Sequence, residues 1–158
     1  MSRPNQKYLD TLLRYYEEEI EGEGYFYAIA ARLKDPDERR KMQMVAEVET
    51  YAAAAVQPLL EKYNLTPAPH AELLAAGQKQ AANSPGDFVH FVAKWRKEFP
   101  GYIDEFEALE AMAPPEDLRL LKILTDHEHA AIEFLEREAK GAPDSTAPMQ
   151  HYLETGMA

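Results

Sequence analysis

The sequence predicts an all-α fold built from four long helices. Alanine, leucine, glutamate and lysine dominate the chain, β-branched residues are sparse, and glycines and prolines gather between the periodic segments. Apolar residues recur at spacings of three and four, which is the period of a helix with one buried face. The four predicted helices span residues 5–34, 37–63, 86–112 and 115–140.

The first two predicted helices each carry one apolar stripe. The first stripe comprises Leu9, Leu12, Leu13, Tyr16, Ile20, Tyr27, Ala30 and Leu33. The second comprises Met42, Val45, Val48, Ala52, Val56, Leu59 and Leu60. Between them the segment LKDPDE places Pro36 in the first turn of a helix, where its missing N–H is not needed. Because this turn is short, we expect an antiparallel hairpin.

The connection over residues 65–85 is long enough to return the chain along the bundle. Turn-forming residues enclose a short helical piece, AELLAAGQKQAA, and a helix of the second one's length measures about 40 Å. The third helix can then run parallel to the second, and the turn at Pro114 and Pro115 folds the fourth back. Two hairpins joined by one crossover form the ferritin-like arrangement of a four-helix bundle. An up-down-up-down bundle with a flexible loop is the alternative.

Length and composition predict one domain over residues 1–140 and a tail over 141–158. In the tail, MQHYL is expected to form a helical turn that packs on the bundle or on a neighbouring subunit, and a homodimer is expected. The chain has no cysteine, which favours a reducing compartment, and a cytoplasmic location is expected. A net charge of -11 argues against nucleic-acid binding. No apolar run is long enough to cross a membrane.

Three glutamates occupy apolar stripes, where acids are unexpected. Glu23 lies on the first stripe, Glu49 on the second, and Glu128 on that of the fourth helix. Glu23 and Glu49 are each thirteen residues from Pro36, so an antiparallel hairpin would bring them to one level. Glu128 lies at a similar distance from the second turn. The three carboxylates are therefore predicted to meet near the middle of the bundle.

Buried carboxylates need compensation, because several together cannot remain ionised in a dry interior. A bound cation, a shared proton or hydrogen bonds from tyrosine hydroxyls would each provide it. In the opposing interpretation, the bundle is irregular and each glutamate reaches solvent between helices.

The segments around these acids resemble the ferritin-like superfamily, in particular its rubrerythrin-like and aldehyde-deformylating oxygenase branches. IEGEGYFYAIA resembles the segment that supplies one glutamate ligand, VAEVETYAAAAV falls at the first Glu-x-x-His motif, and TDHEHAAIEF falls at the second. The resemblance implies metal ligands at Glu23, Glu49 and Glu128. Both family histidines are replaced by alanine, at Ala52 and Ala131.

The resemblance also implies a glutamate ligand from the third predicted helix, but FPGY interrupts that helix at the matching depth. Glu98 and Glu105 flank this break, and Glu105 is the preferred ligand because it lies beyond the proline. His127 and His129 are expected on the flanks of the fourth helix rather than in the site. His90 is likewise not expected to be a ligand.

A site of carboxylates alone would prefer hard cations, and iron or manganese are the candidate cofactors, with a metal-free site as an alternative. The two alanines would leave room for a small ligand. The predicted pocket comprises Tyr16, Tyr27, Tyr51, Ala52, Tyr102 and Ala131. One hypothesis is a metal-dependent enzyme acting on a small organic substrate. The other is a metal-free bundle that binds a small molecule or is purely structural.

Overall fold

The computed structural model describes residues 3–84 and 86–156, and all regular secondary structure within them is helical. The elements in chain order are α1 (Gln6–Arg32), α2 (Pro36–Lys62), α3 (His70–Ala81), α4 (Phe88–Glu98), α5 (Pro100–Met112), the 3-10 helix η1 (Pro115–Asp117), α6 (Leu118–Ala139) and α7 (Ala147–Thr155). The all-α prediction is therefore confirmed. The first, second and fourth predicted helices agree with α1, α2 and η1 plus α6 to within one helical turn.

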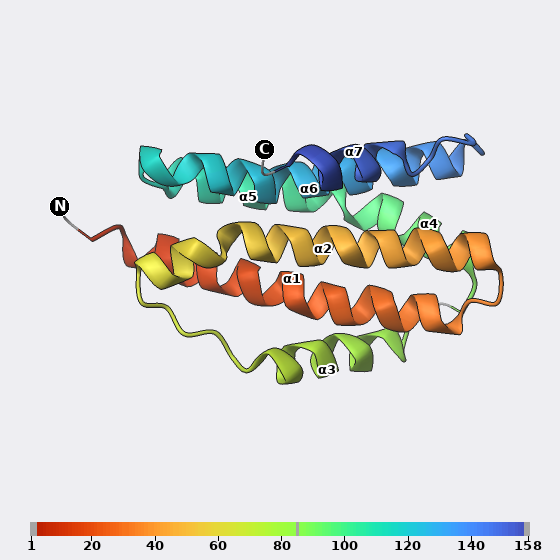
Figure 1. Cartoon of the computed structure of the whole chain (residues 1–158), viewed down its shortest axis with the longest axis horizontal. Coiled ribbons are helices and arrows are strands. Elements are labelled where there is room, and N and C mark those ends of the chain that lie inside the picture. The colour runs from red at the N-terminus through yellow and green to blue at the C-terminus, as the bar shows by residue number, and fades with distance from the viewer. Residues whose placement is uncertain (1–2, 85, 157–158) are drawn as a thin grey trace.

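Helices α1 and α2 form an antiparallel hairpin and lie side by side along the molecule (Figure 1). The Asp35 carboxylate accepts hydrogen bonds from the backbone N–H groups of Asp37 at 2.8 Å and Glu38 at 3.0 Å. These bonds cap the start of α2, and Pro36 occupies its first turn as predicted. The turn is thus fixed by local chemistry, which sets the register of α1 against α2.

The connection between α2 and α4 contains α3, which packs on α1 (Figure 1). The two helices approach through glycines: a Cβ added to Gly77 would collide with the carbonyl oxygen of Glu21, and one added to Gly24 would collide with that of Leu74. Backbones this close require residues without side chains. Most of the connection is therefore an ordered part of the fold.

The third predicted helix, residues 86–112, is two helices that meet at Phe99. Pro100 begins α5 and has no N–H to bond to the carbonyl of Arg96, so α4 ends before it. Figure 1 shows α4 and α5 following one another along α6 and running in the same direction as α2. This direction follows from α3, which returns the chain to the end where α2 begins.

The tail carries a helix, α7, that lies against α2 and α6 (Figure 1). The hydroxyl of Tyr152 donates a hydrogen bond to the carbonyl of Ile123 at 2.9 Å. The ring of Tyr152 meets that of Tyr51 on α2, with centroids 5.1 Å apart. As a result, α6 is covered on a face that the rest of the bundle would leave open.

The apolar core consists of two clusters, one toward each end of the bundle. The first includes Tyr25, Phe26, Val45, Phe91, Phe134 and Leu135. The second includes Leu9, Leu12, Val56, Leu59, Leu121 and Leu124. On α1 one cluster ends at Ile20 and the other begins at Tyr25. A level of buried polar residues, Glu19, Glu49, His127 and Glu128, lies where the clusters meet.

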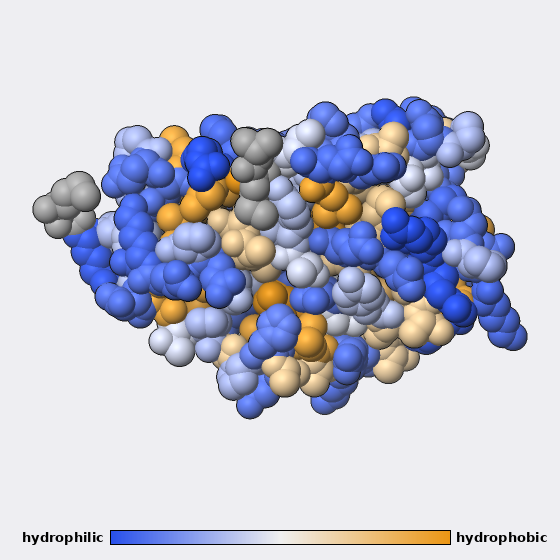
Figure 2. Space-filling model, in the orientation of Figure 1, coloured by the Kyte–Doolittle hydropathy of each residue, from blue (hydrophilic) through white to orange (hydrophobic). Residues whose placement is uncertain are grey.

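The face shown in Figure 2 is mainly hydrophilic, with hydrophobic residues scattered among polar ones. Large hydrophobic side chains that remain exposed are Tyr27, Val89 and Tyr102. Among the described residues, every helix is too short or too polar to span a lipid bilayer.

Candidate metal centre and its cavity

Three helices deliver the buried polar residues. Glu19 comes from α1, Glu49 from α2, and His127 and Glu128 are neighbours on α6. All four residues are at least nine-tenths buried, and His127 is 1% exposed. We refer to Glu19, Glu49, His127 and Glu128 as the His127 centre.

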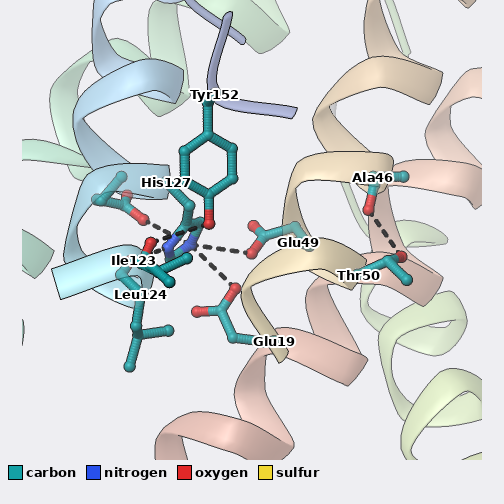
Figure 3. Close-up of polar contacts among 9 residues, drawn as sticks. Glu19, Ala46, Glu49, Thr50, Ile123, Leu124, His127 and Tyr152 are labelled. Atoms are coloured by element: carbon teal, nitrogen blue, oxygen red, sulfur yellow. Dashed lines mark hydrogen bonds and ion pairs between the residues drawn. The ribbon is translucent and has the colours of Figure 1, made fainter. Parts of the chain in front are cut away.

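The carboxylates of the His127 centre converge on one ring nitrogen. Nε2 of His127 lies 3.0 Å from Oε2 of Glu19, 3.2 Å from Oε2 of Glu49 and 3.3 Å from Oε2 of Glu128. In Figure 3, Glu19 and Glu49 point from their helices toward the imidazole. Nitrogen and carboxylate oxygens of Glu19, Glu49 and His127 all lie within 4.8 Å of one another, a spacing compatible with one shared ion.

The other ring nitrogen fixes the tautomer of His127. Nδ1 contacts the backbone carbonyl oxygen of Leu124, which can only accept a hydrogen bond. Nδ1 therefore carries a proton, and in the neutral imidazole Nε2 presents a lone pair to the carboxylates. Histidine ligands of metal ions commonly use this arrangement, in which a backbone carbonyl orients the ring.

Several buried atoms of the His127 centre have no protein hydrogen-bond partner. They are Nε2 of His127, Oε2 of Glu19 and Oε1 of Glu128, since none of the nearby oxygens lies in line with a ring N–H. Buried polar atoms are nearly always satisfied, and leaving one unpaired costs about 1 to 3 kcal/mol. Three such atoms in one cluster are compatible with a ligand at this position.

Burial and mutual repulsion perturb the acids of the centre. Burial, followed by the proximity of Glu49, raises the pKa of Glu19 well above its usual value. Burial raises the pKa of Glu128 to about 8. Burial also opposes ionisation of Glu49, but contacts with Glu19 and His127 hold its pKa below the usual range. Without a metal ion, protons must therefore compensate much of the negative charge.

Burial would lower the pKa of His127, but the carboxylates of Glu19 and Glu49 outweigh it and raise that pKa well above its usual value. In the metal-free centre the imidazole and the carboxyl groups therefore share protons. A divalent cation would displace these protons, because metal ligands must be deprotonated.

Aromatic rings enclose the imidazole. The ring of Phe106 on α5 meets it edge-on, with centroids 5.5 Å apart. Tyr152 of α7 lies beside the imidazole in Figure 3, with its hydroxyl bonded to α6. Helix α7 therefore shields the His127 centre on one side.

On another side the centre faces a cavity of about 480 Å³. Its lining includes Glu19, Glu49 and Glu128, together with Tyr102, Glu105 and Phe106 of α5. Aromatic side chains of α1 and α4 complete the wall: Tyr25, Phe26, Trp95 and Phe99. This volume is within the range of small-molecule sites, so a ligand could reach the buried carboxylates.

The structure brings together two of the three predicted central glutamates. Glu49 and Glu128 both contact His127, whereas Glu23 is half-buried and outside the cluster. Glu19, one helical turn earlier, takes the place that was assigned to Glu23. The expected position was wrong because the hairpin turn is centred on Lys34 and not on Pro36, which shifts the level on α1 by a full turn.

The other expected ligands are also redistributed. Glu105 is exposed and lines the cavity without joining the cluster, and Glu98 is exposed. His127, which was expected on a flank of α6, is instead central. His129 and His90 are exposed and lie outside the cluster. The one imidazole of the cluster therefore belongs to the residue directly before Glu128.

Of the predicted pocket residues, only Tyr102 lines this cavity. Tyr16, Ala52 and Ala131 are packed in the apolar core, and Tyr27 is 42% exposed. Tyr51 packs on Tyr152. Neither alanine lines this cavity, which lies between α1, α4 and α5.

Comparison of the chain with protein-family models, with curated proteins and with solved structures gave no match. No family is shown for it, and the chemistry of the site follows from its side chains.

Proposed function

We propose that the His127 centre binds one divalent metal ion, manganese(II) or iron(II), and that this ion serves a reaction of a small organic molecule held in the cavity. The supporting observation is the convergence of one imidazole nitrogen and three carboxylate oxygens from α1, α2 and α6, with buried atoms left unpaired.

The spacing of these atoms suits a common ion. Ligands about 2.1 Å from one metal lie about 3.0 to 3.4 Å apart in octahedral or tetrahedral arrangements. The three distances from Nε2 of His127 are 3.0, 3.2 and 3.3 Å. Small movements of the side chains would therefore be enough to accommodate the ion.

The donor set favours manganese(II) or iron(II). Carboxylates suit hard cations such as manganese, and imidazole suits iron and zinc, so one nitrogen with two or three oxygens lies between these preferences. A bound ion of this kind would polarise a substrate oxygen or lower the pKa of a bound water. In the protein, Leu124 orients the imidazole and Phe106 holds its ring.

The same proposal treats the helices as a ferritin-like bundle. Helices α1 and α2 would form one hairpin, α4, α5 and α6 the other, and α3 would lie within the crossover. The resemblance implies ligands from all four long segments. Here α4 and α5 contribute none to the cluster among the described residues, which favours one ion over two.

Metal titration of untagged protein, stripped with a chelator, tests the proposal. We expect one manganese(II) or iron(II) ion per chain by elemental analysis. At an ion concentration about 100 times the Kd, binding should stabilise the fold by about 2.7 kcal/mol. Iron titrations require exclusion of oxygen.

Glu49→Gln is the diagnostic variant, with Glu47→Gln as its matched control. Both remove one charge from α2, but Glu47 is partly exposed and pairs with Arg40 at 3.5 Å. We expect Glu49→Gln to lower the affinity for the metal ion by at least about 100-fold. Loss of a direct ligand should have a larger effect than loss of a group that only hydrogen-bonds to a ligand. Absence of a stoichiometric ion, or equal weakening by Glu47→Gln, would overturn the proposal.

A metal-free acid–base site is the second candidate, and Glu128 favours it. Its pKa of about 8 would let it exchange a proton near neutral pH, and it lines the cavity. Carbon-13 NMR of labelled glutamate carboxyls would test this in the stripped protein. A carboxyl that titrates near pH 8, with no ion bound in the metal titration, would support this candidate.

A further inference from the structure

The cavity beside the His127 centre has an acidic rim. Glu18 and Glu105 are exposed and Glu21 is half-exposed, while the acids of the centre form the buried floor. Arg14 is the one cationic side chain in the described lining, and its Nε lies 3.8 Å from Oε1 of Glu18. With that pair balanced, Glu21 and Glu105 leave the rim negative.

Aromatic rings make up the wall between rim and floor. Trp95 of α4 and Phe99, where α4 meets α5, have ring centroids 4.8 Å apart, and the ring of Phe99 also meets that of Tyr102 at 6.2 Å. Aromatic faces attract cations through their quadrupole, most strongly where water is excluded. A wall of this kind also accepts the apolar body of an organic molecule.

The floor offers a buried acceptor. Glu128 is 4% exposed, and its Oε1 has no hydrogen-bond partner, while its Oε2 faces His127. Because Glu128 lines the cavity, its carboxyl group is a hydrogen-bond partner for an N–H group that enters from the rim. It is an observation independent of the charge on the rim.

We propose that this cavity binds a small organic cation, a primary ammonium on an aromatic or branched apolar body, between the acidic rim and the aromatic wall. This organic cation would be the substrate of the metal-dependent reaction proposed above, and its role as a substrate rests on that proposal. Binding itself does not require the metal.

Other ligand classes fit the cavity less well. An organic anion would meet uncompensated charge at Glu21 and Glu105. A neutral hydrocarbon would leave Oε1 of Glu128 unpaired. A divalent ion bound to the floor would compensate Glu19 and Glu49 but not the rim, so the preference for a cation persists in the metal-loaded protein.

Binding can be measured without a label, because Trp95 is the only tryptophan in the chain and lines the cavity. The probes are phenethylammonium and 2-phenylethanol, which share one apolar body and differ in charge. We expect the ammonium to bind at least about tenfold more tightly, with a change in Trp95 fluorescence. Calorimetry on the same samples detects binding that leaves the fluorescence unchanged.

Glu105→Gln and Glu21→Gln test the rim, with Glu107→Gln as control. Glu107 is exposed on the same helix as Glu105 and lies outside the cavity lining. Each rim variant should lower the affinity for phenethylammonium by about threefold and leave the affinity for 2-phenylethanol unchanged. The effect is small because solvent screens exposed charges. Equal affinity for the two probes, or equal loss in Glu107→Gln, would overturn the proposal.

Titrations with and without manganese(II) separate this proposal from that of the metal centre. If no ion binds but phenethylammonium binds with rim dependence, the cavity assignment stands and the metal assignment falls. If the ion binds and the ammonium does not, the reverse holds. If manganese(II) displaces the ammonium competitively, the ammonium occupies the metal position, and the cavity assignment is overturned.

Discussion

The fold buries acidic side chains at two places, and they are treated in opposite ways. At one end of the bundle Asp117 is 0% exposed and accepts hydrogen bonds from Tyr8 at 2.8 Å, Tyr63 at 2.6 Å and Lys62 at 2.6 Å. We refer to Asp117, Tyr8, Lys62 and Tyr63 as the Asp117 centre. In the middle, three glutamates surround one imidazole and leave atoms unpaired.

This difference supports the proposal that the Asp117 centre is structural and that the His127 centre binds an ion. The donors of the Asp117 centre outweigh the effect of burial and hold the pKa of Asp117 below its usual range, so its charge is fully used within the protein. Burial instead raises the pKa of Glu19 and Glu128 at the His127 centre. Acids that resist ionisation without a partner, and that line a cavity, point to an external cation.

The same change made at both centres should give opposite results. Asp117→Asn removes the charge that holds Lys62 and two tyrosines, and we expect it to lower the free energy of unfolding by about 3 kcal/mol. Glu19→Gln replaces an acid whose pKa burial raises well above its usual value, so its cost in the metal-free protein should stay below about 1 kcal/mol. Urea unfolding of stripped protein measures both.

Asp117→Asn should have the larger effect on stability, whereas Glu19→Gln should have the larger effect on manganese(II) affinity. Glu19→Gln should weaken it by about 100-fold, while Asp117→Asn should leave it unchanged. A large loss of stability in Glu19→Gln with intact metal affinity would mean that the His127 centre is structural, like the Asp117 centre.

The two centres should make stability depend on pH in opposite directions. The contribution of the His127 centre should be lost as pH rises, and that of the Asp117 centre as pH falls. The folded-state pKa of Glu128 rises from 4.5 to about 8, so its contribution is complete below about pH 4.5 and is lost as pH rises through about 8. Asp117, whose pKa is lowered, contributes above the ordinary carboxyl range and loses that contribution as pH falls through its folded-state pKa. Stripped protein should lose about 2 kcal/mol between about pH 6 and pH 8.

Manganese(II) provides the control for this pH profile. The ion replaces protons at the His127 centre, so the loss on the alkaline side should disappear in metal-loaded protein. The loss on the acid side should remain in wild type and be reduced in Asp117→Asn. A stability that is flat from about pH 6 to pH 8 in stripped protein would contradict the raised pKa of Glu128.

The sequence predicted the helices well because their signals are local. Apolar periodicity located α1, α2 and α6, and Pro36 marked a helix start through the geometry of proline alone. The break at Pro100 was visible as FPGY, although residues 86–112 were expected as one helix. Proline has no backbone N–H to donate, so it interrupts a helix. It was therefore a stronger signal than the apolar periodicity that continues across it.

The His127 centre was predicted only in part. Which residue of α1 lies opposite Glu49 depends on where the turn between α1 and α2 is centred. Lys34 is midway between the end of α1 and the start of α2, and it is fifteen residues from both Glu19 and Glu49. Counting from Pro36 moved the partner of Glu49 to Glu23. Glu19 and Glu23 share one helical face, so periodicity could not distinguish them.

His127 was missed for a reason outside the local sequence. A helix with one buried stripe would leave its flanks exposed, and His127 is on a flank relative to Glu128. Docking of α7 covers that flank, with Tyr152 bonded to Ile123. The buried face of α6 is therefore wider than one stripe, and only the packing of the tail reveals it.

Single tyrosine hydroxyls, one at each centre, allow a further comparison. Tyr63→Phe removes a donor to an ionised carboxylate and should cost about 1.5 to 3 kcal/mol, toward the lower end because Lys62 and Tyr8 remain. Tyr152→Phe removes a donor to the neutral carbonyl of Ile123 and should cost about 1 kcal/mol. Thermal and urea unfolding compare the two.

Metal affinity distinguishes these tyrosines further. Tyr63→Phe should not change manganese(II) binding, because its hydroxyl serves the distant Asp117. Tyr152→Phe should weaken binding by only a few-fold, since α7 shields the His127 centre without supplying a ligand. A loss approaching that of Glu49→Gln would make Tyr152 a ligand or a direct partner of one. Because its hydroxyl already donates to α6, we expect the small effect.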